Sequence, residues 1–369
     1  MKVLVTGANG FIGKNLCANL FLAGHEVLKY DIDNSEEELR DHLKNCEFVF
    51  NLAGVNRPKE VSEFKTGNSD FLSKVLDILK EHGNLCPVML SSSTQADRDN
   101  PYGESKREAE EKLFAYSRET GAKALVYRFP NVFGKWCRPN YNSAVATFCN
   151  NIACDLPITV NSRETVLELL YIDDLCEEML SALDGKETRL SDYCYVPVTY
   201  KKSLGEIVDL IYSFKESREN LSVINTSDGF ESKLYATYLS YLPKDKFSYP
   251  LVMHSDNRGS FTEILRTKTS GQFSVNISKP GITKGNHWHN TKNEKFVVVK
   301  GRGVIRFRKP DETDIIEYYV CGDEITVVDI PTGYTHSIVN LSEDEDMITF
   351  MWCNECFNPE RPDTFYEEV

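Results

Sequence analysis

The chain lacks an apolar stretch long enough to cross a membrane, because a spanning helix needs about 20 consecutive apolar residues. The apolar run at its start, Met1–Gly7, is also too short for a secretory signal. There is no internal repeat and no low-complexity tract. We therefore expect a cytoplasmic globular protein without a membrane partner, and its 369 residues fit two cores of unequal size.

Positive charge is scarce. The chain has 42 Lys and Arg against 56 Asp and Glu, which gives a net charge of −14. Broad binding to a nucleic-acid backbone needs clustered basic residues, so we expect no nucleic-acid partner. An anionic nucleotide would have to be held locally, by helix N-termini and a few arginines.

A cysteine framework is missing as well. The eleven cysteines are an odd number without regular spacing, and we expect reduced thiols. The pair Cys353 and Cys356 has the CxxC spacing, but a structural zinc site would need a second such pair. Ordinary buried thiols are the favoured interpretation.

The first part of the chain alternates two patterns. Short apolar runs predict strands at 2–6, 26–31, 48–52, 88–92 and 124–128, and helical spacing predicts helices at 13–23, 64–82 and 103–120. Two more helices are expected at 203–218 and 231–242. Such alternation predicts an α/β domain, a Rossmann-like doubly wound parallel sheet with helices on both faces.

A polar break at residues 242–246 predicts a domain boundary within 243–252. Beyond it short strands are expected at 273–277, 295–299, 304–308, 315–320, 324–328, 337–341 and 347–352. Many short strands at near-regular intervals predict an antiparallel sandwich or barrel. The predicted domains are residues 1–243 and the all-β segment 253–369.

A glycine-rich turn follows the first expected strand. In the segment Gly7-Ala8-Asn9-Gly10-Phe11-Ile12-Gly13, the first glycine allows the tight turn, the second lets the backbone approach a pyrophosphate and the third allows close helix packing. This predicts a dinucleotide site, with a structural glycine turn as the alternative. Asp31 ends the second strand and would bind a ribose, which favours NAD over NADP, although Asp33 or a solvated turn explains the same pattern.

Tyr102 and Lys106 are four residues apart on an expected helix, so both project from one face. A nearby ammonium would lower the pKa of the phenol and make Tyr102 a proton donor. Ser91–Thr94 closes the fourth strand, where a hydroxyl can hold a substrate carbonyl. The alternatives are a surface pair and a capped turn.

Together these segments resemble the extended short-chain dehydrogenase/reductase family, in particular its nucleotide-sugar members. The resemblance covers roughly residues 1–240 and includes Gly7–Gly13, Asn51–Gly54, Ser91–Ser93, Tyr102–Lys106, Arg128–Gly134 and Tyr171–Asp174. It implies that the cofactor contacts include Gly7, Asn9, Gly10, Phe11, Ile12, Gly13, Asp31, Leu52, Ala53, Tyr102 and Lys106. Ser93, or its neighbour Thr94, would hold the carbonyl, Tyr102 would be the acid/base and Lys106 would hold the nicotinamide ribose. Asn131 would lie near the diphosphate of the sugar nucleotide.

The chain departs from this family in two places. Only eight residues separate Ser93 from Tyr102, fewer than is usual, so a more open site is expected. The arginine that often precedes the Tyr171 motif is replaced by Leu167–Leu170. Arg163 is the candidate that takes over the diphosphate contact.

The second domain carries a possible metal site. His287 and His289 alternate along an expected strand, so they leave the same face; Glu294 follows a short turn and His336 lies on a distant strand. Three imidazoles and a carboxylate suit a divalent metal, zinc before iron, manganese, nickel or copper. The alternative is a barrel that retains these residues without a metal.

This segment resembles the cupin family over roughly residues 253–369. Its two motifs run from Gly281 to Gly301 and from Pro331 to Asn340, with the second stretched. The resemblance implies the four ligands named above and a homodimer through the barrel. A catalytic site should leave one coordination position open.

The whole chain resembles the bifunctional reductase/epimerase family of capsular polysaccharide synthesis in the UDP-N-acetyl-L-fucosamine pathway. This implies a UDP-linked 2-acetamido-2,6-dideoxy-4-ketohexose as substrate, metal-assisted C3 epimerisation in the barrel, and C4 reduction to the 6-deoxytalose derivative. The resemblance implies NADPH, and Asp31 keeps NADH as the alternative. The catalytic base for the epimerisation is not decided: Tyr334, Lys292 and a water at the metal are the candidates.

Two other functions fit the same residues. The barrel could be only a dimerisation or ligand-sensing module attached to a 4-ketosugar-nucleotide reductase. The first domain could instead be an epimerase or dehydratase that retains its cofactor, which stoichiometric consumption of NADPH would exclude.

Overall fold

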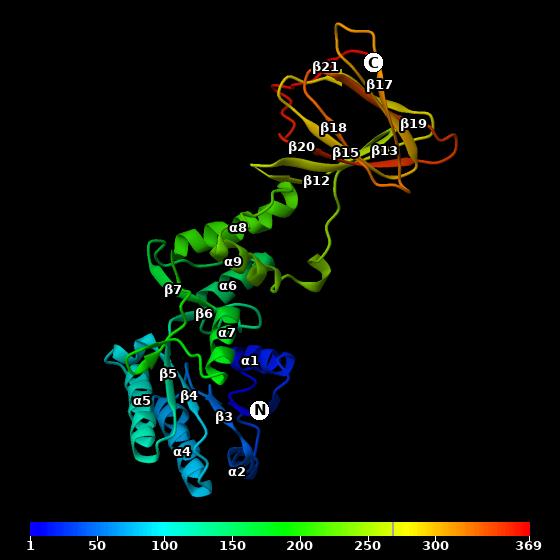
Figure 1. Cartoon of the computed structure of the whole chain (residues 1–369). Helices are drawn as coiled ribbons and strands as arrows, with labels where there is room; N and C mark the ends of the chain where they lie inside the picture. The colour runs from blue at the N-terminus through cyan, green and yellow to red at the C-terminus, as the bar shows by residue number, and fades with distance from the viewer. Residues whose placement is uncertain (268) are drawn as a thin grey trace. The chain divides into compact units, whose positions relative to one another are not determined.

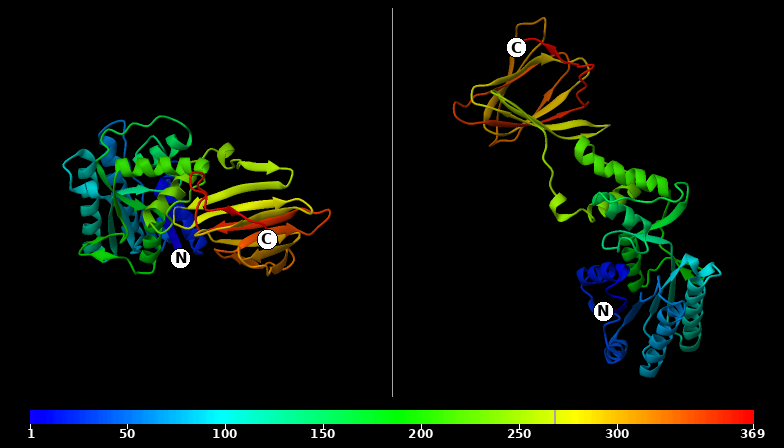
Figure 2. Two further views of the ribbon diagram at one scale, coloured as in Figure 1. Left: turned by 90° about the horizontal axis from the view of Figure 1, so that it is seen from above. Right: turned by 180° about the vertical axis from the view of Figure 1, so that it is seen from behind.

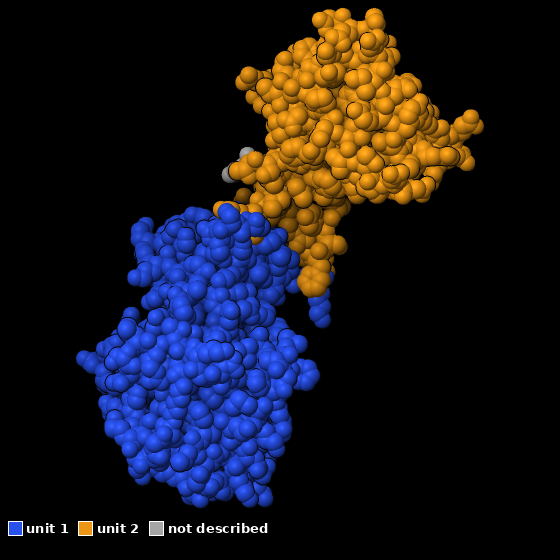
Figure 3. Space-filling model, in the orientation of Figure 1, with its two compact units in different colours: residues 1–214, 226–244 blue, residues 215–225, 245–369 orange. Residues whose placement is uncertain are grey.

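The structure of the chain, a computed structural model, describes every residue except 268. It divides into two compact units, residues 1–214 with 226–244 and residues 215–225 with 245–369 (Figure 3). Helix α8 (Leu204–Asn220) contributes to both units. Among the described residues no helix has both the length and the apolar content that a membrane crossing requires.

Unit 1 is built on a seven-stranded sheet (Figure 1). In spatial order its strands are β2 (Glu26–Tyr30), β1 (Lys2–Thr6), β3 (Phe48–Asn51), β4 (Val88–Ser93), β5 (Ala124–Phe129), β9 (Tyr193–Cys194) and β8 (Arg189–Leu190). All neighbours are parallel except β8 and β9. A smaller sheet pairs β10 (Tyr200–Ser203), β7 (Val166–Tyr171) and β6 (Asn131–Phe133).

The helices of unit 1 cover both faces of the large sheet, and alternate residues of each strand contact the helices of opposite faces. Val3 and Val5 belong to one hydrophobic core and Leu4 to another, as expected for a strand buried on both sides. The first core includes α1 (Phe11–Leu22) and α7 (Ile172–Leu183); the second includes α2 (Glu36–Asn45), α4 (Phe71–His82) and α5 (Pro101–Thr120). The remaining helices are α3 (Ser62–Phe64), η1 (Lys65–Asp70), η2 (Thr94–Asp97), α6 (Ala144–Ala153), α9 (Gly229–Leu239) and η3 (Lys244–Lys246), the last assigned to the boundary between the units.

Unit 2 is built on two antiparallel sheets, whose strands Figure 2 shows in two further views. The sheets enclose one hydrophobic core. The first contains β11 (Met253–Asp256), β12 (Gly259–Thr267), β13 (Gly271–Ser278), β20 (Met347–Cys353), β15 (Glu294–Lys300) and β18 (Val327–Ile330). The second contains β17 (Ile316–Cys321), β16 (Arg302–Arg308), β19 (Thr335–Asn340), β14 (Thr283–Trp288) and β21 (Phe365–Tyr366). The predicted fold class, a doubly wound sheet followed by an all-β domain, is confirmed.

Some expected elements differ. The helix expected at 64–82 is divided into α3, the π-helical η1 and α4, so regular α-helix begins only at Phe71. The strand expected at 324–328 lies instead at Val327–Ile330. Just after α8, Ser222 forms an isolated bridge to Arg266 of β12, where the Val223 N–H donates to the Arg266 carbonyl at 3.0 Å.

Candidate functional site

The glycine turn of unit 1 leaves backbone donors free at the start of α1. Gly7 has a φ of +67°, which glycine adopts without strain. A Cβ on Gly13 would lie 2.1 Å from the Gly7 carbonyl oxygen, so only glycine lets the helix pack this closely. Gly10 gives α1 no side-chain cap. The first N–H groups of the helix are therefore available for a phosphate.

Asp31 holds this turn in place. Its carboxylate accepts the backbone N–H of Asn9 at 2.7 Å and that of Ile32 at 2.8 Å. The expected contact between Asp31 and a ribose stays a prediction. Phe11 and Ile12 begin α1 and pack against the first core, which anchors the helix end of the glycine turn.

The end of β3 lies against the same turn. The Ala53 N–H donates to the Thr6 hydroxyl at 3.2 Å, and that hydroxyl donates to Asn51 at 3.0 Å. A Cβ on Gly7 would lie only 2.8 Å from the Ala53 nitrogen. The segment that contains Leu52 and Ala53 thus reaches the glycine turn through the parallel pairing of β1 and β3.

Three residues expected to carry the reduction meet at the carboxyl edge of the sheet. Ser93 ends β4, and its hydroxyl accepts the Gln95 N–H at 3.2 Å and acts to lower the pKa of Tyr102 on α5. The Lys106 ammonium donates to the Ser91 carbonyl at 3.1 Å and lies 5.8 Å from the centre of the Tyr102 ring. Thr94 is exposed at the start of η2. Of the two hydroxyls, that of Ser93 is the one that acts on the Tyr102 pKa, and the carbonyl-holding role stays a prediction.

Burial controls the titration of both groups on α5. It raises the pKa of Tyr102, although the neighbouring Ser93 side chain acts in the opposite direction. The net pKa of Tyr102 is thus raised, against the expectation that it is lowered, because burial of the phenol is the largest effect on it. Burial also lowers the pKa of Lys106 to about 8, against the charge of Glu110.

The short segment between Ser93 and Tyr102 is closed by tight backbone packing. The Asn100 side chain accepts the Gly103 N–H at 2.9 Å and caps α5. A Cβ on Gly103 would lie 2.4 Å from the carbonyl oxygens of both Gln95 and Arg98. Glycine at this position lets η2 connect β4 directly to α5.

Asn131 and Arg163, the expected diphosphate contacts, have other partners. The exposed Asn131 amide donates to the Glu168 carbonyl at 3.1 Å. Arg163 Nη2 donates to both carboxylate oxygens of Asp209, each at 2.7 Å. Within the described part of the chain no contact joins these two residues, so their substrate roles stay predictions.

Sequence reasoning missed the buried ion pair behind the reductase residues. Glu110 is 1% exposed and accepts two hydrogen bonds from Arg128, at 2.9 and 2.6 Å. It also accepts the hydroxyl of Ser92. The sequence spacing could have revealed Glu110, because it follows Lys106 by four residues and therefore lies on the same face of the helix.

A second missed residue is Asn68, in the π-helical η1. Its amide oxygen accepts the Val55 N–H at 3.1 Å, and its nitrogen donates to the Ser105 hydroxyl at 3.0 Å. Asn68 thereby joins the loop after β3 to α5, beside Lys106. The polar run Gly67–Asp70 inside an apolar helical pattern was the available signal.

In unit 2 the four expected ligands come together between the two sheets. His287 and His336 are paired across β14 and β19, Glu294 begins β15, and His289 follows β14 directly. One potential ligand atom from each residue lies within 4.8 Å of all the others. The Glu294 carboxylate is 3.3 Å from His336 Nε2 and 3.6 Å from His289 Nε2.

The buried polar atoms of this cluster fit a metal ion. Among the described residues His289 Nε2, both ring nitrogens of His336 and one oxygen of Glu294 have no hydrogen-bond partner, although they are buried. Such atoms are costly unless something binds them. The Asp363 carbonyl accepts His289 Nδ1, which fixes the tautomer and leaves the Nε2 lone pair for a ligand.

Burial and neighbouring charges keep His287 and Glu294 in the protonation states that bind a metal. Burial lowers the pKa of His287 to about 4, with the neighbouring His336 and His289 adding to the effect, so its imidazole is neutral. Burial opposes ionisation of Glu294, but the nearby polar rings of His289 and His336 and the charge of Lys292 outweigh it and hold its pKa well below the usual range. Neutral imidazoles and an ionised carboxylate are the forms that bind a divalent ion.

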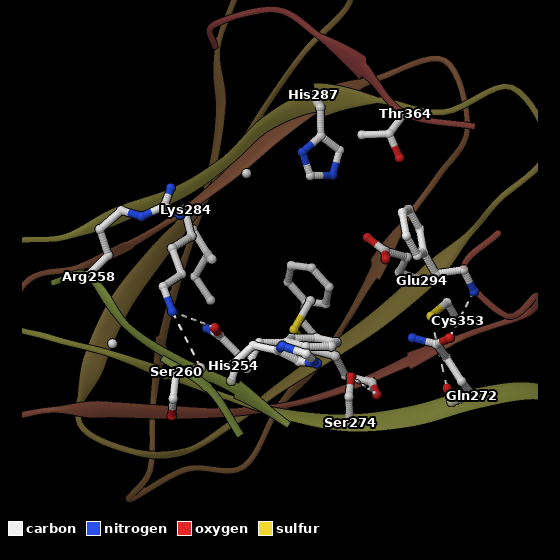
Figure 4. Close-up of a pocket in the computed structure, with 18 of the residues that line it drawn as sticks. His254, Arg258, Ser260, Gln272, Ser274, Lys284, His287, Glu294, Cys353 and Thr364 are labelled. Carbon is white, nitrogen blue, oxygen red and sulfur yellow. Dashed lines mark hydrogen bonds between the residues drawn. The ribbon is translucent and has the colours of Figure 1, made fainter. Parts of the chain in front are cut away.

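The cluster opens into a cavity of about 770 Å³ inside the barrel (Figure 4). His287, Glu294, His336 and Lys292 line it, whereas Tyr334 does not and packs against Phe307 instead. A molecule the size of a sugar can therefore reach the cluster.

These observations define a class of protein: a dinucleotide-binding α/β unit with a Ser–Tyr–Lys site, joined to a β-barrel with a buried ligand cluster. Residues 3–193 match the NAD dependent epimerase/dehydratase family, and the chain belongs to that family. Residues 254–365 match the polysaccharide biosynthesis C-terminal domain. The expected kinship with capsule-synthesis enzymes that join these two parts is confirmed.

Three known proteins illustrate the kinship. The UDP-2-acetamido-2,6-beta-L-arabino-hexul-4-ose reductase of Pseudomonas aeruginosa is 44% identical over 366 residues, which cover 99% of this chain and 98% of the relative. The capsular polysaccharide assembling protein CapF of Staphylococcus aureus has a crystal structure that matches with a TM-score of 0.95 and 53% identity, with 100% of both chains covered. The UDP-glucose 4-epimerase of Thermus thermophilus, at 19% identity and a TM-score of 0.52, covers 65% of this chain and 99% of its own and shows the fold alone.

Proposed function

We propose that the chain reduces C4 of a UDP-linked 2-acetamido-2,6-dideoxy-4-ketohexose for capsule or surface polysaccharide synthesis, after its barrel has inverted C3. The product is UDP-2-acetamido-2,6-dideoxy-L-talose. The observation that carries the reductase function is the Ser93, Tyr102 and Lys106 site in a chain that resembles a 4-ketohexose reductase along its full length. The epimerase function is supported by the cluster and the cavity beside it.

In the reduction, a bound nicotinamide supplies a hydride to C4. The Ser93 hydroxyl holds the carbonyl oxygen, and the Tyr102 hydroxyl donates its proton to that oxygen. Lys106 stabilises the tyrosinate that remains, because its ammonium is held beside the ring by the Ser91 carbonyl. Ketone, hydride and proton together give the alcohol.

In the epimerisation, a proton leaves C3 and returns on the opposite face. The C3 proton is acidic only while C4 is a ketone, since the enolate spreads the charge. A divalent ion held by His287, His289, Glu294 and His336 would supply Lewis-acid stabilisation of that charge. Lys292 is ion-paired with Glu294 at 2.8 Å, so it orients this ligand. Because reduction removes the C4 ketone that makes the C3 proton acidic, epimerisation precedes reduction.

The test of the epimerase is incubation of the 4-ketohexose nucleotide in deuterated water without reduced cofactor. Deuterium is expected at C3, by NMR of the recovered sugar. If none enters, the barrel is a dimerisation or sensing module and the chain is a ketoreductase alone.

The proposed hydride donor is NADPH, with NADH as the alternative that Asp31 favours. A higher kcat/KM with NADPH is expected, and stoichiometric consumption of the reduced cofactor excludes a retained-cofactor epimerase or dehydratase. A homodimer through the barrel is also proposed; sedimentation of the full chain tests it.

A further inference from the structure

A second group of charged side chains lies in the barrel cavity, away from the ligand cluster. Lys284 and Arg258 line the same cavity as His287 and Glu294. Figure 4 shows Lys284 and Arg258 at one side of it and Glu294 at the other. We propose that Lys284, assisted by Arg258, binds the diphosphate of the nucleotide sugar while its hexose lies at the cluster. This inference rests on the proposed epimerisation in the barrel.

Lys284 carries a positive charge that its neighbours do not balance. Its Nζ donates to the Asn276 side chain at 2.7 Å, to the Ile277 carbonyl at 2.8 Å and, more weakly, to the Ser260 carbonyl at 3.5 Å, all neutral acceptors. Among the described residues no carboxylate lies within ion-pair distance of it. Burial lowers the pKa of Lys284, which the charge of Asp256 only partly opposes. An anion in the cavity would supply the missing countercharge.

Arg258 is positioned to add a second donor. Its Nε and Nη2 bind Asp256 at 2.9 and 2.7 Å, which fixes the guanidinium at the hairpin between β11 and β12. Among the described residues nothing bonds its Nη1, so that nitrogen remains a donor. Gly259 follows it, and a Cβ there would lie 3.3 Å from Lys284 Nζ, so no side chain covers the ammonium on that side.

A bulge in β14 brings Lys284 and His287 to the same cavity. In a regular strand two residues three positions apart point to opposite faces. The register with β19 shifts between Gly285 and His287, and Asn286 has a φ of +58°. The inserted residue turns Lys284 toward the face that carries His287. Three residues of strand span on the order of 10 Å, a distance suited to a hexose ring and its phosphate ester.

The C3 exchange assay isolates this site, because it needs no reduced cofactor. UDP is added as a competitive inhibitor and uridine as the matched ligand without phosphate. In Lys284→Met the inhibition constant of UDP is expected to rise roughly ten- to a hundredfold, the loss of a charged hydrogen bond, while that of uridine stays unchanged. The control is Lys295→Met, since Lys295 is exposed and pairs with Asp329 outside the cavity.

The outcomes separate this inference from the proposed function. UDP inhibition unchanged in Lys284→Met, or an equal loss of UDP and uridine binding, would overturn the subsite while leaving the epimerase in place. If the variant loses its fold, as judged by zinc content and thermal unfolding, Arg258→Ala and Lys284→Arg replace it. The first should weaken UDP severalfold and the second should retain binding; the opposite pattern refutes the subsite. An unsubstituted chain that shows no exchange removes the epimerase and this inference with it.

Discussion

Replacing Asp363 with alanine should weaken zinc binding, although Asp363 is not one of the four ligands. Its carboxylate accepts the backbone N–H groups of Asn290, Thr291 and Lys292, at 3.0, 2.7 and 2.9 Å. These bonds hold the turn that carries the chain from His289 to Glu294. Burial acts to raise the pKa of Asp363, but the same bonds outweigh it and hold that pKa well below its usual range.

The size of the effect follows from those contacts. Three hydrogen bonds at about 0.5–1.5 kcal/mol each, partly replaced by water at this half-buried position, give a loss of about 1–3 kcal/mol. If the bound state alone needs the ordered turn, this equals a roughly ten- to hundredfold weaker zinc affinity, the range known for groups that orient metal ligands. The carbonyl of Asp363 accepts His289 Nδ1, so displacement of this backbone would add to the loss.

The assay is competition for zinc between the full chain and a chromophoric chelator. Asp344→Ala is the control, because Asp344 is exposed in the loop before β20 and bonds only to Ser342 within the described chain. The reasoning is refuted if Asp363→Ala binds zinc within about threefold of the control. A variant that keeps its affinity would show that the strands alone order the cluster.

Three further predictions concern the full chain. Tyr102→Phe should lower C4 reduction by roughly 10²–10⁴-fold, followed by NADPH consumption, yet leave C3 exchange intact; loss of both activities would contradict separate sites. Glu110→Gln should destabilise the chain by about 3 kcal/mol in denaturant unfolding, since it leaves the Arg128 side chain without its buried countercharge; the exposed neighbour variant Glu111→Gln should not, and equal losses would refute the argument. Because burial lowers the pKa of Lys106 from 10.5 to about 8, its charge costs stability below that pH, and the cost is relieved as pH rises toward the ordinary value. Unfolding of the unsubstituted chain at neutral and alkaline pH should show this gain relative to Lys106→Met, and parallel profiles would exclude it.

The features that sequence reasoning predicted are those encoded by nearby residues. Val3, Leu4 and Val5 alternate between two cores, so apolar runs reveal a sheet covered on both faces. The glycine turn is local too. Even the cluster of four candidate ligands has a local part, because His287 and His289 are spaced by strand geometry.

The residues it missed depend on contacts that no short pattern records. Asp363 lies 74 positions from His289, and the tail that carries it has no periodicity of its own. Lys284 reaches the cavity only because Asn286 takes a positive φ, which is rare for a residue other than glycine. Arg128 on β5 forms its ion pair with Glu110 only because α5 packs against the sheet. Such positions become visible only when register and packing are known.

The two proposed reactions use the same C4 carbonyl in opposite ways, and the reductase site must therefore distinguish the two C3 configurations. Epimerisation uses the C4 ketone as a sink for negative charge and is reversible, whereas hydride transfer consumes the ketone and the reduced cofactor. A reductase that accepted both C3 configurations would trap unepimerised sugar as a second product. Selectivity must therefore arise where the hexose meets Ser93 and Tyr102. The tightly packed connection through η2, closed at Gly103, joins these two residues directly, so we expect its short length to contribute to that selectivity.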